Sequence, residues 1–276
     1  MKMSIQHSGF KPFLRWAGGK RWLLPKLIEI LSKKQFNRYL EPFLGGGAVF
    51  FGFGFRTAIL SDINNDLINT YIQVRDNPQE LHSKLSKIEV SRQTYYEIRK
   101  ARPDDPIDRA VCFLYLNRTA FAGIYRVNKK GDFNVPYGGG DRTLAPLWNG
   151  GVLFNASKLL QGVSILSQSF EKTLAQAHKG DLVYCDPIYT VTHNDNGFRR
   201  YNESIFSWRD QELLAKYAHQ AAKKGATVIV SNAYHSDIKP LYKDFKAIVV
   251  ERASRLCPDI SKRQLAQEYL FFLNDT

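Results

Sequence analysis

The stretch Tyr39–Phe53, YLEPFLGGGAVFFGF, decides the fold of this chain. Its first residues predict a short strand that ends near Glu41, its glycines predict a tight turn, and its apolar second half predicts a helix. The stretch Thr57–Ile68 follows with TAILSDINNDLI, whose apolar run predicts a second strand that ends in Asp62, 17 positions after Gly45. This order of elements is the βαβ pattern of a sheet that binds a nucleoside.

The alternation of strands and helices returns in the second half of the chain. Apolar runs predict strands in VSILSQSF, DLVYCD, ATVIVSN, AIVV and EYLFFL, and WRDQELLAKYAHQAAKKG predicts an amphipathic helix between the second and third of them. Between these halves, helical stretches lead into a long polar, glycine-rich and basic segment, which is typical of a functional loop. We therefore predict one α/β sheet domain built from residues 1–65 and 151–276, with a mainly helical insert at residues 66–150.

Composition narrows the class of protein. The 276 residues are 44% hydrophobic, which suits a folded chain, and 39 Lys and Arg against 26 Asp and Glu give a formal net charge of +13. This excess favours a polyanionic partner, nucleic acid before an acidic membrane. No window approaches the roughly 18 to 20 apolar residues of a membrane span, and no export signal is visible, so we expect a cytoplasmic protein. Three widely spaced cysteines suit neither a disulfide framework nor a zinc cluster, and we expect no metal.

The glycine triplet is informative only in its context. Glycines after a strand leave room for a ligand against bare backbone, and an acidic residue that ends the next strand can accept hydrogen bonds from a ribose. A plain turn explains such a triplet as well, and the spacing to Asp62 fits NAD, a nucleotide or a methyl donor. Gly45 and Gly47 match the first two glycines of the dinucleotide fingerprint GxGxxG, but Phe50 stands at the third position. This mismatch disfavours a dehydrogenase.

Five motifs in order give a more specific interpretation. They are FLRWAGGK at 13–20, EPFLGGG at 41–47, SDIN at 61–64, LNRTAFAGIYRVNKKGDFNVPYG at 116–138 and DPIY at 186–189. In this order they resemble the DNA adenine N6-methyltransferases of the Dam type, the D12 or alpha group, over nearly the whole chain. The resemblance implies a Rossmann-like S-adenosylmethionine-dependent methyltransferase sheet, with residues 66–150 as an inserted target-recognition domain that binds DNA.

The resemblance also implies a set of cofactor-binding residues. The S-adenosylmethionine site of that family corresponds here to Trp16, Lys20, Phe43, Gly45, Gly47, Asp62 and Asp186. The chemistry of the side chains agrees, because an indole offers a flat face and a lysine can meet the methionine carboxylate. An aspartate at the end of the second strand can accept two hydrogen bonds from the ribose.

The motif DPIY would carry the reaction. The exocyclic amine of adenine is a poor nucleophile because its lone pair is delocalised into the ring, so the base must be flipped out and its amine hydrogens accepted. The resemblance assigns the two acceptors to the Asp186 carboxylate and the Pro187 carbonyl, and the stacking face to the Tyr189 ring. The family usually has a second proline where this chain has Ile188. Since proline restrains the preceding residue, we predict a working but less preorganised site.

The insert is expected to read DNA through a hairpin that matches the stretch Phe121–Tyr137. There the family uses an aromatic residue to fill the gap left by the flipped base and an arginine to read guanine, which correspond to Phe121 and Arg126. The other expected DNA contacts are Ile124, Asn134, Pro136 and, beside the WAGGK tryptophan, Arg15. The stretch RVNKKGDFNVPYG resembles the GATC-modifying branch of the family, and this resemblance implies GATC as the target, although Ala122 stands where that branch commonly has a polar residue.

Several further expectations complete the prediction. Lys129, Lys130 and Arg142 fit phosphate contacts and solvated loop residues equally well, and the polar segment Thr190–Phe206 is expected to act as a lid. The expected partner is double-stranded DNA, and the protein is expected to be a monomer. It is expected to be found with the nucleoid of a bacterial or phage-infected cell. An RNA adenine methyltransferase and a catalytically weakened or inactive DNA-binding homologue are the alternatives. Restriction-modification, phage defence evasion and host marking all remain open as roles.

Overall fold

The computed structural model describes residues 3–5, 8–128, 131–140, 142–148, 151–190, 206–253 and 265–274. The chain packs as two compact units, which are treated separately below. Unit 1 contains Met1–Met3, Gln35–Phe43 and Gln168–Thr276, and unit 2 contains Ser4–Lys34 and Leu44–Ser167. These units do not follow the predicted boundaries at residues 65 and 150, because the helices of the insert pack together with the N-terminal segment. The predicted functional division remains a prediction.

The sheet has seven strands, most of them parallel, in the order β5-β4-β3-β6-β7-β9-β8. In unit 1, β3 (Tyr39–Glu41), β6 (Leu182–Cys185) and β7 (Thr227–Ala233) are parallel neighbours, and β9 (Leu265–Leu273) runs antiparallel to both β7 and β8 (Lys246–Ala253). In unit 2, β4 (Ala58–Asp62) pairs in parallel with β5 (Ser164–Ser167). The strands β1 (Met3–Ser4) and β2 (Gln35–Phe36) form a separate pair. The predicted α/β class and the predicted strands are confirmed.

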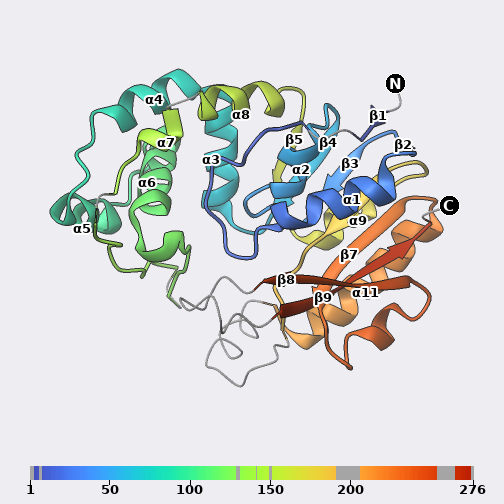
Figure 1. Ribbon diagram of the computed structural model, residues 1–276. Helices are drawn as coiled ribbons and strands as arrows, with labels where there is room; N and C mark the ends of the chain where they lie inside the picture. The colour runs from blue at the N-terminus through green and yellow to red at the C-terminus, as the bar shows by residue number, and fades with distance from the viewer. Residues whose placement is uncertain are drawn as a thin grey trace. The chain divides into compact units, whose positions relative to one another are not determined.

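Unit 2 holds most of the helices. They are η1 (Lys20–Leu23), α1 (Leu24–Leu31), α2 (Ala48–Phe53), α3 (Asn65–Asp76), α4 (Pro78–Ser86), α5 (Arg92–Lys100), α6 (Pro106–Thr119), η2 (Phe121–Gly123), α7 (Ala145–Trp148) and α8 (Val152–Leu160). In Figure 1 the helices α3, α4 and α5 surround α6, and each of them contacts it. Residues are buried on all sides of α6, including Ala110, Phe113, Leu114, Tyr115 and Asn117, so this helix forms the core of the group.

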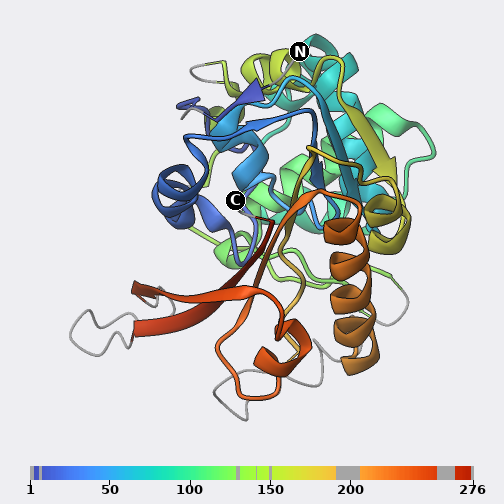
Figure 2. The same ribbon diagram turned by 90° about the vertical axis from the view of Figure 1, so that its right-hand side faces the viewer.

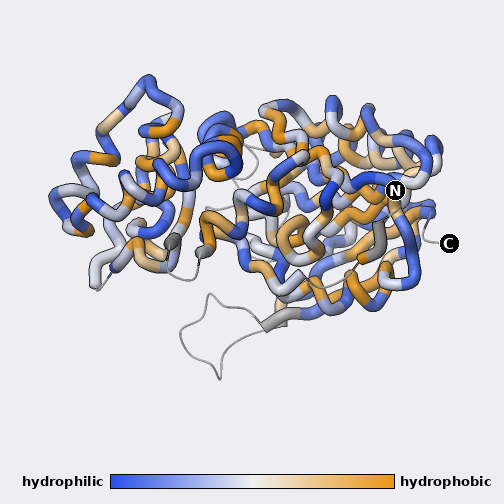
Figure 3. The backbone as a smooth tube through the Cα atoms, turned by 90° about the horizontal axis from the view of Figure 1, so that it is seen from above, coloured by the Kyte–Doolittle hydropathy of each residue, from blue (hydrophilic) through white to orange (hydrophobic). Residues whose placement is uncertain are grey.

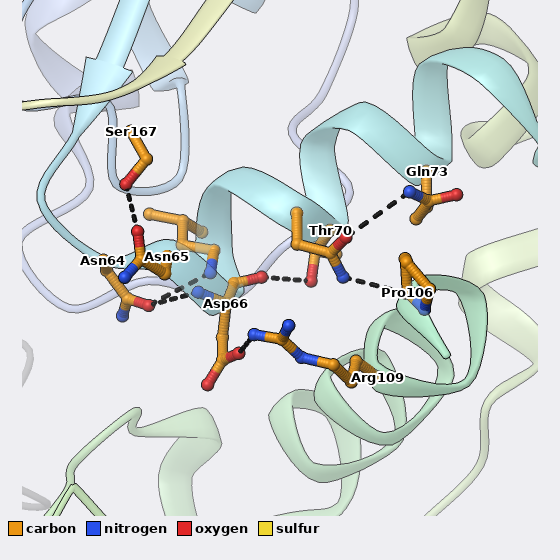
Figure 4. Close-up of polar contacts among 10 residues, drawn as sticks. Asn64, Asn65, Asp66, Thr70, Gln73, Pro106, Arg109 and Ser167 are labelled. Atoms are coloured by element: carbon orange, nitrogen blue, oxygen red, sulfur yellow. Dashed lines mark hydrogen bonds and ion pairs between the residues drawn. The ribbon is translucent and has the colours of Figure 1, made fainter. Parts of the chain in front are cut away.

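The junction between β4 and α3 shows why the chain turns where it does. Asn64 caps α3 through its side-chain oxygen, which accepts hydrogen bonds from the backbone N–H groups of Asp66 and Leu67. Figure 4 shows two further ties, from Ser167 on β5 to Asn65 and from Arg109 on α6 to Asp66. Asn64, Asn65 and Asp66 therefore fix the start of α3 against both β5 and α6.

Unit 1 adds α9 (Phe170–Ala175), α11 (Trp208–Lys223) and η3 (Lys239–Tyr242) to its strands. A capping box starts α11, because Ser207 and Asp210 exchange side-chain to backbone hydrogen bonds. The helix packs against β7, as Figure 2 shows, and buries Leu214, Ala218 and Ala222 along one face. In Figure 3 hydrophilic and hydrophobic residues alternate along the helices, as expected of helices with one buried face.

Membrane-spanning helices and metal-binding clusters were sought in the described residues alone. Within them, no helix is both long and apolar enough to cross a bilayer. The same part of the chain contains no cluster of three or more His, Cys, Asp or Glu side chains arranged to hold a metal ion.

Candidate active site

The glycine loop between β3 and α2 is shaped around the indole of Trp16. A Cβ atom added at Gly45 would lie 2.7 Å from Trp16 Nε1, and one added at Gly46 would lie 2.8 Å from Trp16 Cβ. Gly45 and Gly47 have φ angles of 46° and 63°, in the left-handed region. Both the backbone conformation and the close approach of the indole therefore require glycine here.

The same loop is tied to the end of β4 by Asp62. One carboxylate oxygen of Asp62 accepts the backbone N–H of Gly45 at 3.0 Å, and the other accepts that of Asn64 at 3.0 Å. Tyr71 completes the frame by donating its hydroxyl to the Gly45 carbonyl at 3.0 Å. Burial raises the pKa of Asp62, although the backbone N–H groups act in the opposite direction. An acidic side chain is thus held at the loop and keeps lone pairs for a ligand hydroxyl.

Trp16 also contacts two aromatic residues of the helical region. Its ring stacks on Tyr125 with centroids 5.4 Å apart and on Phe113 with centroids 6.4 Å apart. Asn117 on α6 fixes the backbone just before it, accepting the Arg15 N–H at 2.9 Å and donating to the Arg15 carbonyl at 2.7 Å. The predicted residue Lys20 begins η1 and is only 4% exposed. Unit 2 therefore brings Trp16, Gly45, Gly47 and Asp62 into one frame.

The motif DPIY follows β6 in unit 1. The Ser231 hydroxyl of β7 donates a 2.7 Å hydrogen bond to Asp186 Oδ1, and the Tyr189 hydroxyl donates a 2.7 Å hydrogen bond to Glu268 Oε2 on β9. Burial, then the charges of Asp186 and Glu268, raise the pKa of Tyr189 far above its usual value, so the phenol stays protonated. Pro187 is buried and Ile188 is 39% exposed. The predicted catalytic residues thus form one ordered loop at the end of a parallel strand.

Phe43 and Cys185 also lie in unit 1. Phe43, predicted to contact the cofactor, stacks on Phe170 with centroids 5.4 Å apart and meets Phe206 edge-on at 5.6 Å. Cys185 is free and buried directly before Asp186, and burial raises its pKa, so this thiol is not an activated nucleophile. The ring of Phe43 belongs to an aromatic cluster within unit 1.

The stretch predicted to form the recognition hairpin folds back on itself in unit 2, and its role in recognition stays a prediction. Antiparallel bridges join Ala120 to Tyr137 and Val127 to Phe133. Arg126 donates from Nε to the Asn134 side-chain oxygen at 2.8 Å, and the backbones of the same two residues are joined at 3.1 Å. This pairing brings together two of the predicted DNA contacts.

Phe121, Ile124 and Pro136, three further predicted DNA contacts, lie on the same hairpin. Phe121 is 57% exposed, which is unusual for a phenylalanine, and Pro136 is exposed as well. Ile124 is partly exposed. Lys129, Lys130 and the predicted lid, apart from Thr190 and Phe206, lie outside the described residues.

A basic cavity lies beside the hairpin in unit 2, with a volume of about 400 Å³. Arg15, Arg118 and Arg142 line it together with Gly138–Gly140, Thr143 and Pro146, and none of these lining residues is acidic. Arg118 donates to the Phe13 carbonyl at 2.7 Å, while its Nε has no partner among the described residues. Burial, and secondarily Arg15, lower the pKa of Arg118 to about 10. The cavity is therefore an anion-attracting surface.

Sequence reasoning missed several polar residues that hold the site. These residues are Ser231, Glu268, Gln211 and Arg118. The first three lie outside the five motifs, and Arg118 lies inside one of them but was given no role. A weak signal existed, because Gln211 and Glu268 interrupt otherwise apolar positions of a helix and a strand and are buried there. Polar side chains at such positions usually have assigned hydrogen-bond partners.

Comparison with known proteins agrees with these motifs. A family model described as D12 class N6 adenine-specific DNA methyltransferase matches residues 16–256. The chain is 38% identical over 252 residues to the type II methyltransferase M1.LlaDCHI of Lactococcus lactis subsp. cremoris, covering 87% of each chain. It is 32% identical over 266 residues to the DNA adenine methylase of Escherichia coli, covering 94% of each.

One solved structure gives a weaker comparison. It is a putative RNA methyltransferase from Pyrococcus horikoshii, matched with a TM-score of 0.40 at 9% identity over 98% of this chain and 90% of that one. A likeness at this level bears on neither substrate nor mechanism. The family model and the two relatives are sufficient, and the chain belongs to the D12 class of N6 adenine-specific DNA methyltransferases.

Proposed function

We propose that this enzyme transfers a methyl group from S-adenosylmethionine to N6 of an adenine that is flipped out of duplex DNA, with GATC as its target. The observation that carries the proposal is the ordered loop Asp186–Tyr189, in which a carboxylate and a tyrosine ring are each fixed by a 2.7 Å hydrogen bond. Ser231 and Glu268 supply these bonds from neighbouring strands. The loop has the groups that a flipped adenine needs, two acceptors and an aromatic face.

The residues of unit 2 fit S-adenosylmethionine. The carboxylate of Asp62 offers an acceptor for the ribose hydroxyls of an adenosine, and the indole of Trp16 packs on the glycine loop to which Asp62 is bonded. Lys20 is a buried cation suited to the methionine carboxylate. We assign Gly47 to the same cofactor site, whereas the cofactor contacts expected of Phe43 and Asp186, which lie in unit 1, stay predictions. When bound, S-adenosylmethionine supplies an electrophilic methyl group on a sulfonium.

The protein contributes to the reaction by accepting hydrogen bonds from the adenine amine and by aligning the base with the methyl donor. Asp186 and the Pro187 carbonyl accept hydrogen bonds from the adenine amine, so that its nitrogen recovers lone-pair density, and the Tyr189 ring holds the base by stacking. The hydrogen bond from Ser231 to Asp186 Oδ1 fixes the orientation of this carboxylate. Alignment alone can lower a barrier by roughly 7–11 kcal/mol. Fixed acceptors add electrostatic stabilisation, and no metal is required.

Recognition of DNA is assigned to the hairpin. Because Asn134 holds Arg126 Nε, the plane of the guanidinium is set, and its two Nη groups make no hydrogen bond within the described part of the chain. Such a fork matches O6 and N7 of guanine. The exposed ring of Phe121 suits the gap left by a flipped base, and Ile124 and Pro136 line the same hairpin. Two such contacts support a sequence-specific duplex reader.

The basic cavity is assigned to the DNA backbone. Arg15, Arg118 and Arg142 converge there without an acidic partner among the lining residues, which suits a phosphate. Arg15 was predicted to contact DNA, and the cavity makes phosphate contact, not base reading, the role that we assign to it. We further propose that the enzyme is a monomer that acts in the cytoplasm, with the nucleoid.

Methyl transfer to defined duplexes tests the proposal. Tritiated S-adenosylmethionine is supplied with a duplex that contains one GATC, with the same duplex carrying GTTC, and with ribosomal RNA. Incorporation is expected in the first substrate alone, and Asp186→Ala should abolish it. Incorporation into RNA would favour the RNA methyltransferase alternative, and tight duplex binding without any transfer would favour the inactive homologue. Sequencing of methylated adenines in expressing cells then gives the target directly.

A further inference from the structure

The loop Asp186–Thr190 is restrained mainly by side chains that lie outside it. Residue 188 is isoleucine, so the backbone lacks the ring restraint that a proline would impose at that position. Four residues of the loop, Asp186, Ile188, Tyr189 and Thr190, nevertheless make side-chain or carbonyl hydrogen bonds to α11, β7 and β9, all within unit 1. Of the residues that supply these bonds, Gln211 has no role in the function proposed above, and Glu268 has none there beyond its bond to the Tyr189 hydroxyl.

Gln211 lies in the first turn of α11 and is completely buried. Its Nε2 donates to the Thr190 hydroxyl at 3.1 Å and, through a longer contact of 3.4 Å, to the Ile188 carbonyl. Its Oε1 accepts from Asn232 Nδ2 at 2.9 Å, and Asn232 is itself completely buried. Because rotation of the amide would break these bonds, Gln211 holds the distal half of the loop in one position.

Glu268 acts on the tyrosine of the loop. It is 3% exposed on β9 and accepts the Tyr189 hydroxyl at 2.7 Å. A buried carboxylate is costly unless it is hydrogen-bonded, and a hydrogen bond to a charged group is stronger than one between neutral groups. The bond fixes the far end of the phenol, so it sets the direction of the ring's long axis and the position of the ring.

We propose that Gln211 and Glu268 are positioning residues for adenine methylation: Gln211 orients the backbone that presents the Pro187 carbonyl, and Glu268 orients the Tyr189 ring. This inference rests on the proposed function of the loop. Together the two residues restrain from outside a loop that lacks a proline at position 188.

The variants are chosen to separate positioning from folding. Gln211→Met removes both donor contacts, and Gln211→Glu keeps an acceptor for Asn232 while it removes the donors. Gln220→Met changes an exposed glutamine of the same helix and is the matched control. For the tyrosine, Glu268→Met removes the acceptor, Glu268→Gln retains one, and Glu251→Met on β8 is the control because Glu251 is exposed.

Two measurements read the variants. Single-turnover methylation of a GATC duplex with saturating S-adenosylmethionine should slow on the order of 10- to 100-fold in Gln211→Met, Gln211→Glu and Glu268→Met, with duplex affinity within a few-fold of the parent. Glu268→Gln should recover most of the rate. In a Tyr189→Phe background, Glu268→Met should cost little more, since the hydroxyl on which it acts is gone. Equal losses in both backgrounds, or rates that match the controls, would overturn the proposal.

Amide hydrogen exchange over residues 185–190 measures how firmly the backbone of the loop is held, and it needs no catalytic turnover. Exchange there should be at least about tenfold faster in Gln211→Met and Gln211→Glu, and unchanged in Gln220→Met. Unchanged exchange in the Gln211 variants, or faster exchange with full activity, refutes the positioning role of Gln211. A parent enzyme that methylates no duplex refutes the proposed function instead, and the exchange result still decides whether the loop is held by this residue.

Discussion

The rings of Trp16 and Tyr125 stack with centroids 5.4 Å apart and an angle of 20° between their planes. Trp16 packs on the glycine loop, and Tyr125 lies in the recognition hairpin one residue before Arg126. A single aromatic contact within unit 2 therefore connects the proposed cofactor site to the proposed DNA reader. Binding at one site is expected to influence the other through it.

We predict that Tyr125→Ala weakens this linkage. Loss of the stack should remove about 0.5–1.5 kcal/mol, so the gain in duplex affinity on binding S-adenosylmethionine should fall by a factor of about 2 to 10. Tyr125→Phe keeps the ring and should behave like the parent. Calorimetric titration of duplex with and without S-adenosylmethionine measures the effect, and an undiminished gain in Tyr125→Ala would contradict it.

Binding of S-adenosylmethionine should weaken on acidification at an unusually high pH. The carboxylate of Asp62 is the form that accepts ribose hydroxyls, and burial raises its pKa. Because the pKa is raised, protonation begins at a higher pH than for an ordinary aspartate, and affinity is lost as the pH falls through it. Titrations across the acidic range check this, with Asp62→Asn as the comparison. A pH dependence that survives in Asp62→Asn would assign it to another group.

Arg118 should contribute to DNA affinity without contributing to selectivity. If it meets a phosphate in the basic cavity, Arg118→Met should lower affinity for every duplex alike and reduce the slope of log affinity against log salt by about 0.9. Arg56, an exposed arginine of unit 2, gives the control Arg56→Met. Fluorescence anisotropy at several salt concentrations measures both slopes. Identical slopes for the parent and Arg118→Met would remove the cavity from the DNA interface.

Arg126 should have the opposite profile. Arg126→Met is expected to lower, by about 1–3 kcal/mol, the discrimination between GATC and a site that carries another base in place of the guanine. The reason is that the bidentate contact to O6 and N7 of guanine is lost. Asn134→Ala should give a smaller loss in the same direction, because it releases Arg126 Nε but keeps the guanidinium. Methylation rates on the two duplexes provide the ratio. Uniformly slower methylation with the ratio preserved would argue against base reading.

Ile188→Pro should raise turnover and leave the affinity for S-adenosylmethionine unchanged. The ring would restrain Pro187 toward extended geometry. The gain should be less than about tenfold, because Gln211 already contacts the carbonyl of residue 188 and the loop is held at Tyr189 as well. Steady-state kinetics on a GATC duplex check the direction, and slower turnover would refute the restraint argument.

Much of the fold could be predicted from residues 39–68. Glycines between two apolar runs, followed by Asp62, specify strand, turn, helix and strand with little ambiguity, and β3, α2 and β4 lie where this pattern places them. The motif DPIY likewise marks the end of β6. The division of the chain into its two packed units could not be predicted. No sequence pattern shows that α6 is buried on all sides or that the insert packs in one unit with the N-terminal segment.

The supporting residues of the site were also beyond the sequence. Glu268 follows Tyr189 by 79 positions and Ser231 follows Asp186 by 45, and only the pairing of β6, β7 and β9 brings them together. Arg118 was part of a motif, yet its orientation toward the cavity depends on Phe13, 105 positions earlier. A motif identifies residues that take part in one reaction. The hydrogen-bond partners of these residues on other strands depend on how the strands pair, which the sequence does not reveal.

The contact between Trp16 and the glycine loop has an evolutionary consequence. The indole occupies the space that a side chain at residue 45 or 46 would need, so these two parts of the chain cannot vary independently. Relatives that carry alanine in the loop should also have exchanged the tryptophan for a smaller residue. The two glycine motifs, whose nearest glycines Gly19 and Gly45 are 26 positions apart, are therefore expected to change together.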